Sequence, residues 1–442
     1  MKAGFISLGC AKNLVDTEVM LGMLAESGIE ITVDPGTADI IIINTCSFID
    51  AAKEESINTI LQNARYKEEG KCRALIVAGC LGQRYQQNLL DELPEVDAIV
   101  GTGAWHRINE AIAAVFSGQR VLFINETDTI YDESMPRIKS TPAYSSYVKI
   151  AEGCSNCCSY CVIPMVRGEF RSRTIESVVN EVTLLAAQGT KEINLIAQDT
   201  TSYGRDIYGT PRLVELLRQL VKIEGIVWIR LLYCYPRYFT DELIELMANQ
   251  PKICKYIDLP LQHIHDNILK AMNRRDSSSD IENLLKRIRE AIPNVAIRTS
   301  FIVGFPGETD EEFAALEQFM AKEKFDHVGV FTYSQEEDTV AAKLPNQISD
   351  EVKQERYHRL MSLQSRISEE RNTSLEGQTL AVLVEGRRSG TDGEVVFGRS
   401  EREASDIDGC IYLENASDAK IGDFVTARII QGFTYDLLAE KI

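Results

Sequence analysis

The sequence predicts an α/β protein in three parts: an N-terminal parallel sheet covered by helices, an incomplete barrel of six βα units, and a small antiparallel β-barrel. Short apolar runs alternate with amphipathic stretches through most of the chain, which is typical of parallel sheets with helical crossovers. Short strand-like segments broken by Gly, Asn and Asp then fill the last seventy residues. A chain of 442 residues is also too long for a single ordinary core.

Changes in composition predict the boundaries between these parts. Residues 126–146 are polar and irregular and contain Pro136 and Pro142, which indicates a connecting segment. We therefore expect an N-terminal domain at residues 1–130, a linker at 131–145, a central domain at 146–372 and a C-terminal domain at 373–442.

Three predicted strands of the N-terminal domain are each followed by a cysteine. The strands are expected at residues 3–8, 40–44 and 74–78, with helices at 14–27 and 51–64, and the cysteines are Cys10, Cys46 and Cys80. Because the carboxyl ends of parallel strands share one edge of a sheet, these thiols should converge there. The sequence thus favours a three-thiolate metal site, with buried apolar cysteines as the alternative.

The central domain shows six further strand signals separated by helices with a 3.6-residue apolar period. The strands are expected at residues 148–150, 193–197, 228–232, 256–259, 296–303 and 327–331. One helix carries Ile281, Leu284 and Ile288 on one face, and another begins with the capping box of Thr309 and Glu312. Six βα units in series indicate an incomplete barrel with its chemistry at the carboxyl ends of the strands.

A second group of cysteines follows the first strand of this barrel. Cys154, Cys158 and Cys161 have the spacing C-x3-C-x2-C, which supplies three thiolates within one loop. A structural zinc site or a redox-inert four-iron cluster uses four protein ligands. Three thiolates therefore indicate a cluster with one iron left open for a substrate or cofactor.

A polar helix at residues 349–372 leads to the C-terminal domain, where strands are expected at 380–384, 393–397, 409–413, 424–430 and 434–439. Small barrels of this kind often bind nucleic acid. Residues 374–442, however, contain seven Lys or Arg against thirteen Asp or Glu, a net charge of −6. Such a domain is a poor phosphate binder and a suitable docking surface for a basic protein.

Overall composition is consistent with a soluble protein in a reducing compartment. The net charge is −19, which disfavours binding of nucleic acid mainly through phosphates. Eleven cysteines, an odd number in a long chain, indicate thiolates rather than a disulfide framework. No apolar run approaches the ~20 residues needed to span a bilayer, so we expect a cytoplasmic protein without a membrane segment.

The cysteine loop at the start of a βα barrel resembles the radical S-adenosylmethionine (SAM) superfamily. The resemblance implies that Cys154, Cys158 and Cys161 hold a [4Fe-4S] cluster whose open iron binds SAM, with Tyr160 beside the adenine. Electron transfer from that cluster would cleave SAM to a 5′-deoxyadenosyl radical. Other barrel segments suited to the cofactor are Gln198 and Asp199, Arg298 and Ser300, and the turn at Gly304.

The order of the three parts is similar to that of the methylthiotransferases, a branch of this superfamily whose last domain is called TRAM. In that family the N-terminal cysteines, here Cys10, Cys46 and Cys80, hold a second [4Fe-4S] cluster that carries sulfur. One SAM methylates the sulfur, another yields the radical, and a methylthio group replaces a hydrogen of the substrate. The resemblance also implies a reducing electron donor such as a flavodoxin, a sulfur donor and a monomeric enzyme.

Two motifs indicate which substrate class is used. SLGCAKNLVDTE at residues 7–18 and QDTTSYG at residues 198–204 are similar to the subfamily that modifies an aspartate β-carbon in small-subunit ribosomal protein S-twelve, a strongly basic partner. The tRNA-modifying subfamily more often has Gln-Met-Asn after the first cysteine. Ala11 departs from the usual proline without affecting a ligand. Methylthiolation of tRNA adenosine is the near alternative, and a non-enzymatic iron–sulfur scaffold or electron carrier is the alternative from another class.

Several further residues allow a structural and a functional interpretation. The arginines after the cysteine loop either face solvent or bind a carboxylate, and the two histidines after the fourth barrel strand are expected to serve structural hydrogen bonds. The remaining cysteines are expected to be packed thiols or bystanders. These residues are Arg167, Arg171, Arg173, His263, His265, Cys72, Cys157, Cys234, Cys254 and Cys410.

Overall fold

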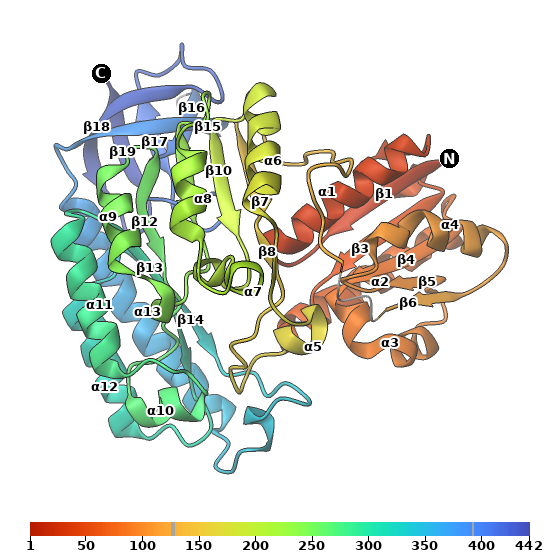
Figure 1. Cartoon of the computed structure of the whole chain (residues 1–442), viewed down its shortest axis with the longest axis horizontal. Helices are drawn as coiled ribbons and strands as arrows, with labels where there is room; N and C mark the ends of the chain where they lie inside the picture. Colours follow the sequence, from red (N-terminus) through yellow and green to blue (C-terminus); the bar gives the residue numbers. More distant parts are fainter. Residues whose placement is uncertain (125–128, 391–392) are drawn as a thin grey trace.

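Two open parallel sheets and one closed barrel make up the fold (Figure 1). The computed structural model describes residues 1–124, 129–390 and 393–442. The N-terminal domain projects to one side of the central domain, and the C-terminal barrel covers one end of the central strands.

The N-terminal sheet contains six parallel strands in the order β2-β1-β3-β4-β5-β6. Their bounds are β1 Lys2–Ser7, β2 Glu30–Thr32, β3 Ile40–Thr45, β4 Ala74–Gly79, β5 Ala98–Val100 and β6 Val121–Phe123. The helices are α1 Ala11–Glu26, α2 Asp50–Ala64, α3 Cys80–Glu92 and α4 Ile108–Phe116. The sequence predicts β1, β3 and β4 but not β2, β5 and β6, because three residues are too few to show a strand period.

Helices cover both faces of this sheet, which explains the uninterrupted apolar run of β3. Ile40 and Ile42 pack with α1 and α4 on one face, while Ile41 and Ile43 pack with α2 and α3 on the other. All four side chains are fully buried. A strand buried on both faces needs apolar residues at every position.

The central sheet is an open, curved row of six parallel strands in the order β14-β13-β12-β11-β10-β7. The strands are β7 Ser145–Lys149, β10 Glu192–Ile196, β11 Trp228–Leu231, β12 Ile253–Asp258, β13 Ala296–Val303 and β14 His327–Thr332. The outer helices are α6 Ile175–Ala187, α8 Leu213–Leu220, α9 Asp241–Asn249, α11 Ser278–Ala291, α12 Asp310–Glu323 and α13 Asp350–Thr373. Sequential neighbours and parallel pairing confirm the incomplete barrel, and the capping box at Thr309 and Glu312 is present.

Short elements shape the active edge of this barrel. They are the two-stranded pair β8 Ala151–Glu152 and β9 Arg171–Ser172, with the helices α5 Ile163–Arg167, α7 Arg205–Tyr208 and α10 Asp266–Ala271. The antiparallel pair β8–β9 closes the cysteine loop at its base. Its two residues per strand leave no pattern that a sequence can show.

The C-terminal barrel closes in the order β15-β16-β17-β19-β18. Its strands are β15 Thr379–Gly390, β16 Gly393–Arg399, β17 Ile411–Glu414, β18 Phe424–Gly432 and β19 Leu437–Lys441. Four of the pairs are antiparallel, but β17 and β19 are parallel, which the prediction of an antiparallel barrel did not include. A ring of five strands cannot alternate direction throughout, so one parallel pair is unavoidable.

The last residue of β16 and the segment after it attach this barrel to the amino end of the central strands. Arg399 forms an ion pair with the buried Glu192, and Arg230 donates to the backbone oxygen of Glu401 at 2.8 Å. The hydroxyl of Tyr256 donates to Asp408 at 2.7 Å. The C-terminal domain therefore lies at the end of the barrel opposite to the cysteine loop.

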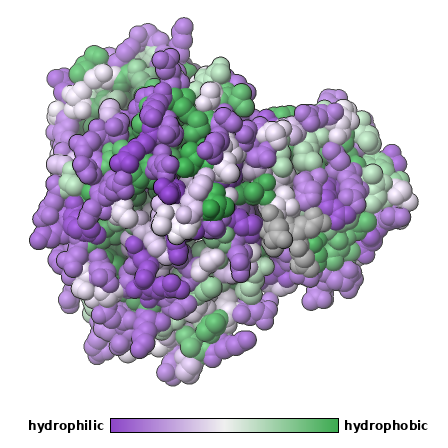
Figure 2. Space-filling model, viewed as in Figure 1, coloured by the Kyte–Doolittle hydropathy of each residue, from purple (hydrophilic) through white to green (hydrophobic). Residues whose placement is uncertain are grey.

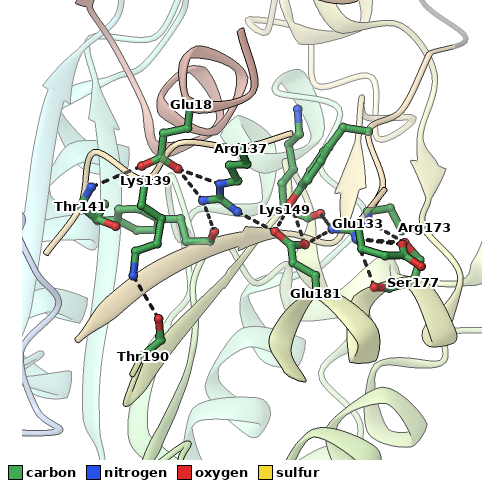
Figure 3. Close-up of polar contacts among 12 residues, drawn as sticks. Glu18, Glu133, Arg137, Lys139, Thr141, Lys149, Arg173, Ser177, Glu181 and Thr190 are labelled. Atoms are coloured by element: carbon green, nitrogen blue, oxygen red, sulfur yellow. Dashed lines mark hydrogen bonds and ion pairs between the residues drawn. The ribbon is translucent and has the colours of Figure 1, made fainter. Parts of the chain in front are cut away.

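Strand β7 begins at Ser145, the last residue of the expected linker, and residues 131–144 contain no helix or strand. The linker is nevertheless tied to both neighbouring domains (Figure 3). Arg137 donates to Glu18 of α1 and to Glu181 of α6, each at 2.6 Å, and Ser140 donates to Glu18 through its amide and its hydroxyl. Glu18 is fully buried. These contacts fix the N-terminal domain against the barrel.

Polar side chains cover most of the face seen in Figure 2, with apolar ones in small groups. None of the helices in the described ranges is long and apolar enough to cross a bilayer.

Candidate active site between two cysteine triads

Glycine and neighbouring loops fix the conformation of the loop that carries Cys154, Cys158 and Cys161. Gly153 has φ +78°, and a Cβ there would lie 2.1 Å from the backbone oxygen of Glu169, so only glycine fits. The amide of Cys154 donates to Gly168 at 3.1 Å, and the amide of Cys161 donates to Cys158 at 3.1 Å. All three thiols are partly accessible.

The middle of this loop is anchored to the barrel. Ser159 donates its amide to Met272 at 2.9 Å and accepts from the amide of Ala341 at 2.8 Å. Tyr160 packs against an apolar cluster that includes Phe305 and Tyr333. These contacts fix the part of the loop that directly follows Cys158.

The second triad lies at the carboxyl edge of the N-terminal sheet. Cys10 is the N-cap of α1, Cys46 follows β3 and Cys80 begins α3. Asn13 connects the three segments: its amide nitrogen donates to Leu8 at 3.0 Å and to Thr45 at 2.9 Å, and Cys80 donates to its oxygen at 3.7 Å. The structure brings these three distant cysteines together, as the strand-end pattern predicts.

The donor set of both triads fits iron–sulfur clusters. Burial raises the pKa of Cys154 to about 12 and that of Cys80 to about 12, so neither thiol ionises readily without a cation. Bound metal removes the proton from a coordinating thiol. Within the described residues no three His, Cys, Asp or Glu side chains converge on one metal ion, which is compatible with a cluster because its ligands bind separate irons.

Cys10 has a different electrostatic environment. Burial acts to raise its pKa, but the cations of Lys12 and Arg167 outweigh that effect and hold the pKa of Cys10 below its usual value. Arg167 thereby brings positive charge from the barrel to the N-terminal triad.

Helix α5 joins the two triads across the domain interface. It starts two residues after Cys161, and Val162 and Val166 pack directly on Cys80. At its end the buried Arg167 donates to Asn13 and forms an ion pair with Glu152 at 2.8 Å. Figure 1 shows α5 between the barrel and α3 of the N-terminal domain. Helix α5 and Arg167 therefore connect the two cysteine sites across the domain interface.

The residues predicted to contact SAM occupy different environments. Gln198 donates to Glu152 at 2.7 Å, and in the described part of the chain its buried side-chain oxygen has no partner. Asp199 is buried, accepts from Asn156 at 2.8 Å and caps the turn at Ser202. A cavity of about 200 Å³ beside Cys154 is lined in part by Asn156 and Asp199.

The remaining predicted contacts lie on β13 and just after it. Arg298 donates to Asp258 at 2.9 Å and lies 3.6 Å from Asp408, so its guanidinium is already paired with carboxylates. Ser300 is buried on the same strand. Gly304 has φ +71°, and a Cβ there would lie 2.3 Å from Lys353 of α13. Backbone conformation and packing against α13 therefore explain this glycine without a cofactor.

The structure shows the surroundings of the arginines, histidines and cysteines that allow both a structural and a functional interpretation. Arg173 is buried and donates to Ser177 and Glu181, and Arg171 donates to backbone oxygens, so both stabilise the loop base. His263 is fully buried and its Nδ1 accepts from the amide of His265 at 3.0 Å. The His265 ring lies 3.3 Å from Glu312, so the contacts of all four residues favour structural roles. Cys72, Cys234 and Cys254 are buried, Cys410 is half-buried and Cys157 is exposed.

Sequence reasoning missed Lys12. Its ammonium nitrogen lies 2.8 Å from the ring centroid of Tyr233, which follows β11 at the active edge of the barrel. Burial lowers the pKa of Lys12 to about 8. A lysine in the first turn of an amphipathic helix ordinarily faces solvent, so the local pattern gave no reason to place it in an interface.

Family models match three consecutive parts of the chain. Residues 2–101 match the Uncharacterized protein family UPF0004, residues 148–320 match the Radical SAM superfamily and residues 377–442 match the TRAM domain. Among solved structures, the radical S-adenosylmethionine methyltransferase TsrM from Kitasatospora setae has a TM-score of 0.56 at 15% identity, covering 75% of this chain and 74% of that one. At such identity the likeness shows the fold alone.

Curated relatives are similar over the full length. The ribosomal protein uS12 methylthiotransferase RimO of Geobacter sulfurreducens is 54% identical over 100% of this chain and 98% of its own. Relatives of the same name from Trichlorobacter lovleyi and Desulforamulus reducens are 50% and 53% identical over 100% and 99% of this chain, in each case covering 98% of the relative. The chain therefore belongs to the RimO family of radical SAM methylthiotransferases.

Proposed function

We propose that this enzyme methylthiolates the β-carbon of an aspartate in the small-subunit ribosomal protein uS12. The observation that carries the proposal is the pair of three-cysteine sites that α5 links. One site alone would suit either a radical enzyme or a simple iron–sulfur carrier. Two linked sites suit a reaction that needs a radical and a sulfur source at the same carbon.

The residues divide between two [4Fe-4S] clusters. Cys154, Cys158 and Cys161 would hold the SAM-binding cluster, and Cys10, Cys46 and Cys80 would hold the auxiliary cluster. When bound, the clusters and SAM supply the radical and the methylthio group. The protein contributes the cysteine ligands, a partly buried environment and helix α5, which links the two sites.

SAM is expected to lie over the cysteine loop. We assign Tyr160 to the adenine side and the unpartnered oxygen of Gln198 to the SAM ammonium, while Ser300 and Gly304 line the adenosine side. Asp199 and Arg298, which are paired within the protein, are assigned to positioning: Asp199 holds Asn156 of the cluster loop, and Arg298 holds Asp258.

The acidic TRAM domain is proposed as the docking surface for uS12. Part of its negative charge is directed inward, since Glu385 and Asp408 pair with buried cations of the interface with the barrel. Exposed acidic side chains remain at Glu376, Glu394, Asp406, Glu414 and Asp418. We also propose a cytoplasmic monomer that depends on a reducing donor such as a flavodoxin and on a separate sulfur donor.

The test compares the two substrate classes. Reduced, cluster-reconstituted enzyme is incubated with SAM and either uS12 or tRNA, and the products are analysed for the methylthio mass increase. We expect the increase on uS12; an increase on tRNA alone would contradict the proposal.

Cysteine variants test the two sites separately. Replacing Cys154, Cys158 and Cys161 with alanine should abolish 5′-deoxyadenosine while the auxiliary cluster keeps its iron and sulfide. Cys157→Ala is the matched control, because Cys157 lies in the same loop but is exposed. It should retain both clusters and full activity.

A further inference from the structure

Lys12 places a cation at the interface between the two triads. It lies two residues after Cys10, in the first turn of α1, and its side chain is almost completely buried. Its ammonium lies over the ring of Tyr233, which has φ +61° and belongs to the barrel. One residue of the N-terminal domain thus reaches the active edge of the central domain.

No carboxylate neutralises this ammonium. In the described ranges its nitrogen forms neither a hydrogen bond nor an ion pair. Asp258, the carboxylate under Tyr233, accepts from Arg298 at 2.9 Å and from the amide of Tyr233 at 2.8 Å. Glu152 is paired with Lys149 and Arg167. The nearby acids are therefore already used by other donors.

An ammonium group has three N–H donors, and a ring face satisfies only part of that capacity. The neighbouring Cys10 offers charge compensation, but no described acceptor takes a hydrogen bond from the ammonium. Unmet N–H donors in a buried position are costly, so this position is suited to an acceptor anion supplied from outside the chain. The chemistry fits a carboxylate. Two carboxylates belong to the reaction, that of SAM and that of the target aspartate.

We propose that Lys12 binds the side-chain carboxylate of the target aspartate and so holds its β-carbon between the two triads; this rests on the proposed function. The aspartate is the favoured source because Lys12 comes from the N-terminal domain beside Cys10, whereas the residues assigned to SAM all come from the barrel. Lys12 is thereby a substrate-binding residue, and Tyr233 positions its side chain.

The first arm of the test changes the substrate. Full-length, cluster-reconstituted enzyme is titrated with fluorescently labelled uS12 that carries either Asp or Asn at the modified position. Loss of a hydrogen bond to a charged group predicts about 10- to 150-fold weaker binding of the Asn form. Equal binding of the two forms by the wild type would overturn the inference, and this arm needs no variant to fold.

The second arm changes the enzyme. Lys12→Met keeps the length of the side chain and removes the charge, so it should bind Asp and Asn forms equally, while Lys12→Arg should keep a preference for Asp. Lys286→Met on α11 is the matched control, because Lys286 is exposed and remote from the triads. It should retain the full preference.

Two further readouts separate the sources of the carboxylate. Iron content, sulfide content and SAM binding should be unchanged in Lys12→Met. A preserved Asp preference together with weakened SAM binding would overturn the inference and assign Lys12 to SAM. If wild-type enzyme modifies tRNA and not uS12, the proposed function and this inference fall together; if it modifies uS12 and Lys12→Met still prefers Asp, only the inference falls.

Discussion

Gly9 shows how one residue shapes a cluster site. It precedes Cys10 with φ +85°, and a Cβ at this position would lie 2.9 Å from the Cβ and 3.2 Å from the sulfur of Cys46. The turn therefore needs glycine for its backbone conformation and also for the approach of two cysteine loops.

A Gly9→Ala substitution is expected to remove iron from the N-terminal site, because the added methyl group displaces Cys46. Iron and sulfide analysis should find about half of the wild-type content. Gly118→Ala is the matched control, since Gly118 has φ +84° with no atom within 4 Å of an added Cβ. It carries a similar backbone strain and should keep both clusters. Equal iron in both variants would contradict this account.

At the scale of elements, short segments hold the domains together. Helix α5 has only five residues, yet Arg167 at its end contacts Asn13, Asp16 and Glu152. Arg399, the last residue of β16, does the same for the C-terminal barrel. In both cases a buried arginine pairs with a carboxylate of another domain.

Arg167→Ala should lower the free energy of unfolding by roughly 3–5 kcal/mol, because it leaves Asp16 and Glu152 buried with only Lys149 as a cation. Chemical denaturation of the full-length chain measures this change. Arg167→Lys keeps the charge and should lose less. Arg218→Ala, which breaks an exposed ion pair with Glu242, is the control and should change stability little. A loss for Arg167→Ala no larger than that of the control would refute the prediction.

The stability of the contact between the C-terminal barrel and the central domain should depend on pH. Burial acts to raise the pKa of Glu192, but Arg399 and Arg230 outweigh it and hold the pKa at about 2. A depressed carboxyl pKa stabilises the fold above the unfolded value of about 4.3, and this stabilisation is lost as the pH falls towards 2.

Glu192→Gln should therefore be much less stable than wild type at pH 7, and the difference should shrink as the pH falls below about 4.3. Denaturant unfolding at several pH values measures it. Glu290→Gln, at an exposed position of α11, should match wild type throughout. A wild-type advantage that stays constant between neutral and acidic pH would rule out the ion pair as its cause.

At the scale of the whole molecule, the net charge favours a basic partner. The chain has a net charge of −19, and its C-terminal domain keeps acidic side chains on the surface even though several face inward. Long-range attraction between an acidic enzyme and a basic substrate accelerates association and is screened by salt.

Binding of uS12 is accordingly expected to weaken several-fold when the salt concentration rises from about 50 mM to about 300 mM. Glu414→Lys should weaken it at low salt, as measured by fluorescence anisotropy. Glu290→Lys on the outer barrel is the control for total charge and should have a smaller effect. Equal effects of the two charge reversals would place the docking surface elsewhere.

The sequence by itself determined the three-part α/β fold and the convergence of Cys10, Cys46 and Cys80. Apolar runs such as residues 40–43 and the capping box at Thr309 are local signals, and they predicted strands and helices closely. The repeated strand-end position of the three N-terminal cysteines predicted that they meet, because the edge of a parallel sheet is a property of its topology. That these cysteines, and Cys154, Cys158 and Cys161, hold clusters stays a prediction.

Only the tertiary structure decided what lies between the triads. Lys12, Arg167 and Tyr233 are far apart in the sequence, and each has an ordinary local pattern. The inward pairing of TRAM acids such as Asp408, and of Arg298 with Asp258, likewise depends on how domains pack. Long-range contacts decide whether a charged side chain faces water, a ligand or another domain. Local sequence patterns do not report these contacts.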